Sequence, residues 1–438
     1  MATPLYDTLL VNLRLADGGA PGRALALKDG RIAAILPPDA PAPPAGQILD
    51  LDGDLLLPAL VDGHMHTSSS RGWPGIEGAS KTAAAGGVTT CVDMPYDVPR
   101  PVTDAGILQE KIEYVNRLSH VDMALYGTIL KSGGVDAIAG LAEAGVCSFK
   151  LSTYEYDPVR FPRIDHPTMV AAFREIAKTG LMVAVHNEDQ EIVVRLTEEA
   201  KAAGNTQPIW HCRTRPPLCE TMADLEIFEI GLETGAHVHI AHSSLARGFE
   251  IAEVFRRMGG KASGEACLQY LCMTEEDIIR LEGFGKCNPP FRTADEVERM
   301  WGAFAKGQVA YVSTDHAPWP RDRKTYTGDI FTVGAGLTGM QSFAPVMFSL
   351  LKQRGLSPSL MALYCAERPA RFHGLYPKKG ALPITGLPYD YSWAGLTYKP
   401  GDYSDEAEDL HYYGGELLDA FVFGNWGIGD TALGVRAG

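Results

Sequence analysis

Two histidines separated by one residue, His64 and His66, end an apolar run that begins at Leu55. In an extended strand, residues i and i+2 point to the same face, so both imidazoles could bind one metal ion. Two satisfied polar side chains at a strand end would leave the same pattern, and a lone His-x-His is a weak signal. The pair therefore predicts a metal site only if further ligands converge on it.

Four other residues able to bind metals hold the same kind of position, at the end of a short apolar run. They are Lys150 in SFKLST, His186 in VAVHNE, His242 in HIAHSS and Asp315 in VSTDHA. In barrels of alternating strands and helices, the active site is built at the carboxyl ends of the strands. The separations of these residues are close to whole numbers of strand–helix units, except that residues 207–217 indicate an insertion. We therefore expect all of them at one rim.

Lys150 needs a separate explanation, because an ammonium inside an apolar strand is costly and would repel a cation. Addition of CO₂ would convert the amine into a carbamate, an anion with two oxygens that can bridge two metal ions. The alternative is a lysine whose stem lies along the strand while its head reaches water. Among metal-binding histidines, we favour the carbamate.

Eight short runs rich in Val, Ile, Ala and Thr alternate with amphipathic segments such as AGILQEKIEYVNRL and HPTMVAAFREIAKTG. Buried strands separated by helices indicate a parallel sheet, and eight such units match a closed (β/α)₈ barrel. We therefore predict an α/β fold with a TIM-type barrel over residues 56–379.

Both ends of the chain lack this alternation. Residues 1–55 contain short strand-like runs with a Lys-Asp-Gly turn at 28–30, and the Tyr- and Gly-rich tail ends in short β-like pieces. We expect residues 1–55 and 380–438 to form one small β-sandwich domain.

The composition excludes some functions. The chain has 438 residues and a formal charge of −15, which is unsuitable for binding nucleic acid phosphates or an anionic membrane surface. Eight scattered cysteines without a C-x-x-C pair indicate reduced thiols, and we find neither a signal peptide nor a membrane-length apolar run. We therefore expect a cytoplasmic protein.

With its motifs taken together, the sequence resembles the cyclic amidohydrolases: hydantoinases, dihydropyrimidinases, allantoinases and, more distantly, dihydroorotases. The resemblance covers roughly residues 50–380. It rests on these segments: LLLPALVDGHMH (55–66), AAAGGVTTCVDMP (83–95), GEACLQYL (264–271), KCNPPFR (286–292), STDHAP (313–318) and GAGLTGMQ (334–341).

The resemblance implies a site with two divalent metal ions. Zinc is the expected metal, and Mn, Fe and Co are the alternatives. Its first metal would be held by His64, His66 and Asp315, its second by His186 and His242, and carboxylated Lys150 would bridge them. A hydroxide between the metals would attack the carbonyl, and Asp315 would be the catalytic residue that carries its proton to the leaving nitrogen.

The substrate pocket departs from the family pattern. Dihydroorotases carry an arginine that binds the substrate carboxylate where this chain has Ser68, so we expect dihydroorotate to be excluded unless another residue, such as Arg71, replaces it. Glu155 stands where dihydropyrimidinases have a tyrosine, and Ala335 replaces a family asparagine. The candidate substrate-binding residues are Arg71, Tyr154, Tyr156 and Asn288.

These observations predict a cyclic amidohydrolase that opens the C–N bond of a cyclic amide, imide or ureide. One alternative is the same dinuclear centre acting on an acyclic amide or a lactone. Another is a non-catalytic scaffold like the dihydropyrimidinase-related proteins, which typically lose metal ligands that this chain keeps. The expected binding partner is a small cyclic amide substrate. The family resemblance also implies a homo-oligomer, either a dimer or a tetramer.

Overall fold

The structure is a computed structural model that describes residues 4–15, 21–29, 31–376 and 378–379, and the backbone of 411–413 and 420–423. The described residues fall into two compact units, one with residues up to 62, 81–90 and from 340 onward, the other with 63–80 and 91–339. The boundaries that we expect at 55/56 and 379/380 remain a prediction.

The first strands form a sheet of their own. Strand β1 pairs antiparallel with β2 and parallel with β4 and β5, and β2 and β3 form the expected hairpin, with Asp29 at φ 49° in its turn. Buried leucines, Leu10, Leu13 and Leu25 among them, form the core of this sheet. From the far end of the chain, β15 pairs antiparallel with β5, and β14 pairs with β15. The strands are β1 (Tyr6–Leu15), β2 (Arg23–Lys28), β3 (Arg31–Leu36), β4 (Ala45–Asp50), β5 (Leu55–Pro58), β14 (His411–Tyr413) and β15 (Ala420–Phe423).

Eight further strands form the predicted barrel. Their order in the sheet follows the chain from β6 to β13, and the pairs whose register is defined are parallel. Met65, at the end of β6, bridges His316, just beyond β13, which brings the first and last strands together. This confirms the (β/α)₈ fold class. The strands are β6 (Leu60–Met65), β7 (Val88–Asp93), β8 (Asp122–Gly127), β9 (Ser148–Ser152), β10 (Met182–His186), β11 (His237–Ser243), β12 (Lys261–Cys267) and β13 (Val312–Ser313).

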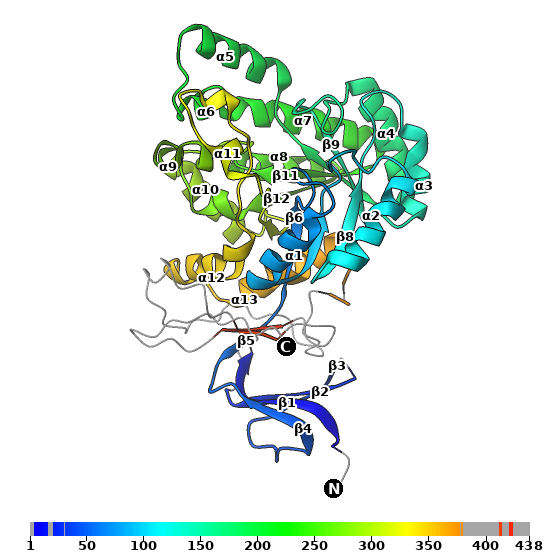
Figure 1. The fold of residues 1–438 in the computed structure, drawn as a ribbon, viewed down its shortest axis with the longest axis vertical. Helices are drawn as coiled ribbons and strands as arrows, with labels where there is room; N and C mark the ends of the chain where they lie inside the picture. Colours follow the sequence, from blue (N-terminus) through cyan, green and yellow to red (C-terminus); the bar gives the residue numbers. More distant parts are fainter. Residues whose placement is uncertain are drawn as a thin grey trace. The chain divides into compact units, whose positions relative to one another are not determined.

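Helices cover the outer face of these strands, as α4, α7 and α8 do in Figure 1. Phe149, Val183 and Val238 of the strands pack in one core with Phe173 and Phe228 of the helices. The helices are α1 (Gly75–Ala85), α2 (Ala105–Leu118), α3 (Ile138–Glu143), α4 (His166–Thr179), α5 (Gln190–Ala202), α6 (Trp210–Arg213), α7 (Pro217–Thr234), α8 (Ala246–Arg257), α9 (Glu275–Leu281), α10 (Ala294–Ala305), α11 (Arg321–Lys324), α12 (Phe343–Gln353), α13 (Ser359–Ala362) and α14 (Arg368–Phe372).

The expected insertion between His186 and His242 is present. Helices α5 and α6 stand between β10 and α7, where a single strand–helix unit would hold one helix. Asp189 caps α5, since its side chain accepts a hydrogen bond from the amide of Ile192. The capped helix begins at Gln190, four residues after His186.

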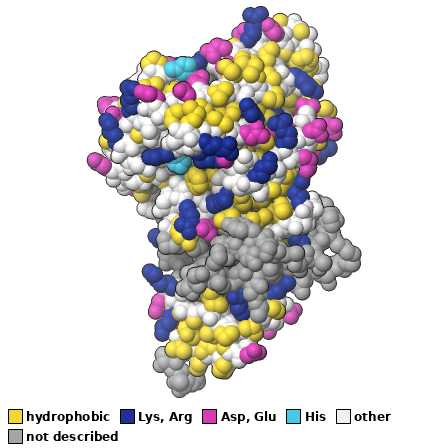
Figure 2. Space-filling view, turned by 180° about the vertical axis from the view of Figure 1, so that it is seen from behind, with side chains coloured by type: hydrophobic (Ala, Val, Ile, Leu, Met, Phe, Trp, Pro, Cys, Tyr) yellow, Lys and Arg dark blue, Asp and Glu magenta, His cyan; other side chains and the backbone are white. Residues whose placement is uncertain are grey.

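Figure 2 shows Lys and Arg side chains interspersed with Asp and Glu on the face that it presents. Within the described part of the chain, every helix is too short or too polar to span a lipid bilayer. All eight cysteines are free.

Candidate active site

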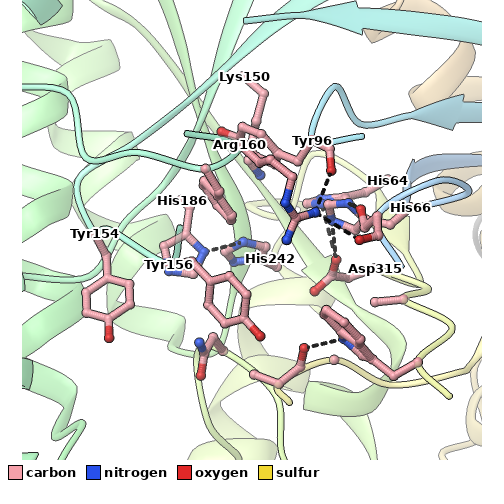
Figure 3. Close-up of a pocket in the computed structure, with 17 residues that line it drawn as sticks. His64, His66, Tyr96, Lys150, Tyr154, Tyr156, Arg160, His186, His242 and Asp315 are labelled. Carbon is pink, nitrogen blue, oxygen red and sulfur yellow. Dashed lines mark hydrogen bonds and ion pairs between the residues drawn. The ribbon is translucent and has the colours of Figure 1, made fainter. Parts of the chain in front are cut away.

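The carboxyl ends of the barrel strands bring the predicted metal ligands together. His64, Lys150, His186 and His242 lie within β6, β9, β10 and β11, His66 follows β6 directly, and Asp315 lies two residues after β13. All of them line one pocket, shown in Figure 3. Polar side chains that converge on one pocket mark a candidate site for a small molecule.

His64, His66 and Asp315 form the first cluster. Oδ1 of Asp315 lies 3.3 Å from Nε2 of His64 and 3.3 Å from Nε2 of His66. Burial alone would raise the pKa of Asp315, but His64 and His66 hold it below its ordinary value. Asp315 is therefore an anion that faces two imidazole nitrogens, which is a donor set suited to a divalent metal ion.

His186 and His242 form the second cluster. Nδ1 of His186 lies 3.0 Å from Nε2 of His242, and the rings of His242 and His64 are 5.3 Å apart. Ligand atoms of His64, His242 and Asp315 lie within 4.8 Å of one another, so the two clusters are continuous. Burial lowers the pKa of His242 well below its ordinary value, which keeps the imidazole neutral, as metal binding requires.

Lys150 lines the same pocket as both clusters. Its side chain is 1% exposed, and Nζ makes no hydrogen bond to any residue that the structure describes. Burial lowers the pKa of this lysine to about 8, which raises the share of neutral amine, the form able to add CO₂. A buried amine without a hydrogen-bond partner among the described residues, beside histidines and an aspartate, suits a residue that would help to hold metal ions better than a structural lysine.

Two of these residues have a backbone conformation that L-amino acids rarely adopt. His242 has φ 44° and Asp315 has φ 49°. A hydrogen bond from the backbone amide holds each turn. The amide of His242 donates to Oε1 of Glu265, and the amide of Asp315 donates to the carbonyl of His64. Such backbone strain concentrates at functional sites, and here it belongs to two of the six predicted ligands.

Glu265 on β12 is a residue of this site that the sequence reasoning missed. Glu265 lies in the segment GEACLQYL, which contributes to the family resemblance, but the sequence alone assigns it no role. Its Oε1 accepts a 2.5 Å hydrogen bond from Nδ1 of His64 and also the bond from the His242 amide. One buried carboxylate thus orients a histidine of each cluster, and by accepting at Nδ1 of His64 it leaves Nε2 to face Asp315.

Replacing Glu265 with alanine is expected to weaken metal binding about 10–100-fold, the usual cost of losing the outer partner of a metal-binding histidine. Glu265→Gln keeps an oxygen that can accept from His64, so it should lose less. Competition with a chelator measures both affinities, and melting of the metal-free proteins checks the fold. Unchanged affinity in Glu265→Ala would show that His64 needs no such partner.

A second buried network supports the loop after His66. Asp93 accepts hydrogen bonds from the amide and the hydroxyl of Thr67, at 2.8 and 2.7 Å. Lys111 of α2, which has no exposed surface, lies 2.6 Å from Asp93 and 2.9 Å from Asp97. Burial alone would lower the pKa of Lys111, but these two carboxylates raise it above its ordinary value. The lysine therefore stays charged beside the two carboxylates, and burial raises the pKa of Asp97 to about 6.

Lys111→Met should destabilise the protein by about 3–5 kcal/mol, because it leaves buried carboxylates without their cation. Lys178→Met is the control, since Lys178 forms only an exposed pair with Glu175 and should cost less than about 1 kcal/mol. Urea denaturation measures both. Equal midpoints for the two variants would rule out a supporting role for the network.

The predicted substrate-binding residues divide into two groups. Tyr154, Tyr156 and Asn288 line the pocket, and their roles there remain predictions. Arg71 is exposed and is not among the lining residues. Among the described residues, the arginine that lines the pocket is Arg160, for which the sequence offered no motif.

Comparison with known proteins agrees with this geometry. The sequence pattern described as "Amidohydrolase family" matches residues 55–384, and one described as "Protein of unknown function (DUF1302)" matches 367–438. An allantoinase of Solibacter usitatus is 35% identical over 370 residues, 84% of this chain and 80% of that protein. An L-hydantoinase of Paenarthrobacter aurescens is 29% identical over 386 residues, 87% of this chain and 84% of that protein.

Among solved structures, the L-hydantoinase (dihydropyrimidinase) from Arthrobacter aurescens superposes with a TM-score of 0.81 at 28% identity. The match covers 86% of this chain and 84% of that one. The family pattern spans most of the barrel and includes all of the predicted metal ligands. This chain belongs to the amidohydrolase family.

Proposed function

We propose that this protein is a metal-dependent cyclic amidohydrolase that opens the ring of a cyclic amide, imide or ureide. The observation that carries the proposal is the buried Lys150, which has no hydrogen-bond partner among the described residues and shares one pocket with both histidine clusters and Asp315. The relatives named allantoinase and L-hydantoinase act on rings of this kind, which supports the same substrate class.

In this proposal, His64, His66 and Asp315 would hold one divalent cation, His186 and His242 would hold a second, and the carbamate of Lys150 would serve as a ligand shared by both. Zinc suits this nitrogen and oxygen donor set, as do Mn, Fe and Co. When bound, the cations polarise the amide carbonyl and lower the pKa of a water molecule.

The remaining chemistry belongs to side chains of the pocket. Asp315 accepts the proton of the attacking water on a carboxylate oxygen and returns it to the leaving nitrogen as the C–N bond breaks. Tyr154 packs against the guanidinium of Arg215, 4.7 Å from its ring centre, and Arg215 donates to Glu188, which also contacts His186. Tyr154 and His186 are therefore coupled, and we assign Tyr154, Tyr156 and Asn288 to the substrate ring.

Turnover of a panel of rings by metal-loaded protein tests this function. The panel is hydantoin, allantoin, dihydrouracil, dihydroorotate and succinimide, with an acyclic amide and a lactone as the alternatives. We expect at least one ring to be opened to its acid and the activity to be lost after chelation. Hydrolysis of the acyclic amide or lactone alone would replace the proposal by the rival enzyme, and a metal-loaded protein inert toward the whole panel would contradict it.

The free cysteines fit a reducing compartment, so we propose a cytoplasmic enzyme. By resemblance to the family, we also propose a homo-oligomer, a dimer or a tetramer. Light scattering of the purified protein measures the assembly, and a monomer at micromolar concentration would contradict it.

A further inference from the structure

A short hairpin after β9 presents Arg160 to the pocket. Residues 156–161 fold back on themselves, since the amide of Phe161 donates to the Asp157 carbonyl and the amides of Tyr156 and Asp157 donate to the Phe161 carbonyl. The side chain of Asp157 closes the turn by accepting from the amides of Val159 and Arg160. These hydrogen bonds define the backbone conformation at Arg160.

The guanidinium is held at one side and open at the other. Nη1 donates to the carbonyl of Ser69 at 2.9 Å and contacts that of Tyr96 at 3.4 Å, while Nε lies 3.5 Å from a carboxylate oxygen of Asp157. These contacts leave Nη2 available to a ligand. Figure 3 shows the guanidinium extending into the pocket beside Tyr96, toward the histidines and Asp315.

Charge within the pocket favours an anion near Arg160. Among the described residues that line it, Asp315 is the one acidic side chain, and Asp315 faces His64 and His66. Asp157 lies beside Arg160 but is not among the lining residues. A guanidinium pairs strongly with a carboxylate, which can accept from two of its nitrogens.

Aromatic side chains complete the surroundings. Tyr96 and Phe161 stack with their ring centres 3.8 Å apart. The rings of Phe161 and His186 are nearly perpendicular, with their centres 5.5 Å apart. Tyr156 and Trp319 line the same pocket. A flat amide ring can lie among these apolar surfaces with its reacting carbonyl at the histidines, and a substituent of the ring then reaches Arg160.

We infer that Arg160 binds a carboxylate on the substrate, so that the enzyme selects cyclic amides or ureides with an acidic substituent. The inference rests on the proposed function. It also revises the expectation from Ser68, since a carboxylate-binding arginine comes from the loop after β9 and not from the loop after His66. The competing reading is that Arg160 only ties the loops at Ser69 and Tyr96 together through their carbonyls.

The test uses two substrates of nearly the same shape, hydantoin-5-acetic acid and its primary amide, hydantoin-5-acetamide. We expect the wild-type enzyme to prefer the acid, and Arg160→Gln to lower the acid-to-amide ratio of kcat/KM about 10–100-fold, the range for hydrogen bonds to a charged group. Arg160→Lys keeps the charge and should retain part of the preference. Arg174→Gln, which changes an exposed arginine of α4, is the matched control and should leave the ratio unchanged.

Binding is measured separately, by calorimetry in the metal-loaded Asp315→Asn background with and without Arg160→Gln. Tighter binding of the acid than the amide, lost with Arg160→Gln, supports the inference even if the wild-type enzyme opens neither ring, a result that would instead count against the proposed function. An unchanged acid-to-amide ratio, or equal losses on both substrates, would overturn the inference and leave Arg160 as a tie between loops.

Discussion

Lys150→Ala is expected to lose most of its bound metal and on the order of 10³-fold in kcat, because metal-supplied stabilisation of several kcal/mol disappears with the shared ligand. The expectation rests on a lysine that is 1% exposed, with no hydrogen-bond partner for Nζ among the described residues. Among the described residues that line the pocket, Asp315 is the one acidic side chain. The carbamate would supply a second anion to the metal ions.

Lys150→Arg is the matched variant, since it keeps a cation in the strand but forms no such carbamate. It should fail like Lys150→Ala. Short-chain carboxylic acids should restore part of the activity of Lys150→Ala alone, by supplying the missing anion in the space left by the side chain. Metal analysis and turnover decide the matter, and full metal content with normal turnover in Lys150→Ala would contradict the role assigned to this lysine.

The barrel, and the position of the candidate ligands at its rim, could be predicted because both follow from local patterns. A buried parallel strand is a short apolar run, and the residue at its carboxyl end lies at the rim whatever the rest of the chain does. His64, His186 and Asp315 could therefore be placed from their own segments. The β2–β3 hairpin followed in the same way from a turn between two apolar runs.

The supporting residues could not be predicted in this way, because their partners are distant in the chain. Glu265 lies 201 residues from His64, and Arg160 lies 91 residues from Ser69. Arg71 was chosen for its nearness in sequence to the His-x-His motif, yet its side chain is exposed. One signal was available for Glu265, since an acidic residue inside an apolar strand needs a buried partner.

Asp315→Asn should keep the fold and substantial metal while kcat falls by at least about 10³-fold, toward the upper end for loss of general acid–base catalysis. Asparagine preserves the shape and one ligating oxygen of the side chain. It cannot take a proton from water and pass it to the leaving nitrogen. The left-handed backbone at this position, φ 49°, also tolerates asparagine better than most residues.

Metal content and kcat determined on the same preparation of Asp315→Asn, with the best ring from the substrate panel, test the central claim most directly. Asp322→Asn, which changes an exposed carboxylate on α11, serves as the control and should match the wild type in both measurements. We predict metal content near that of the wild type with at least about a 10³-fold loss of kcat. Retention of more than about a tenth of the wild-type kcat, far less than loss of general acid–base catalysis costs, would show that another group carries the proton.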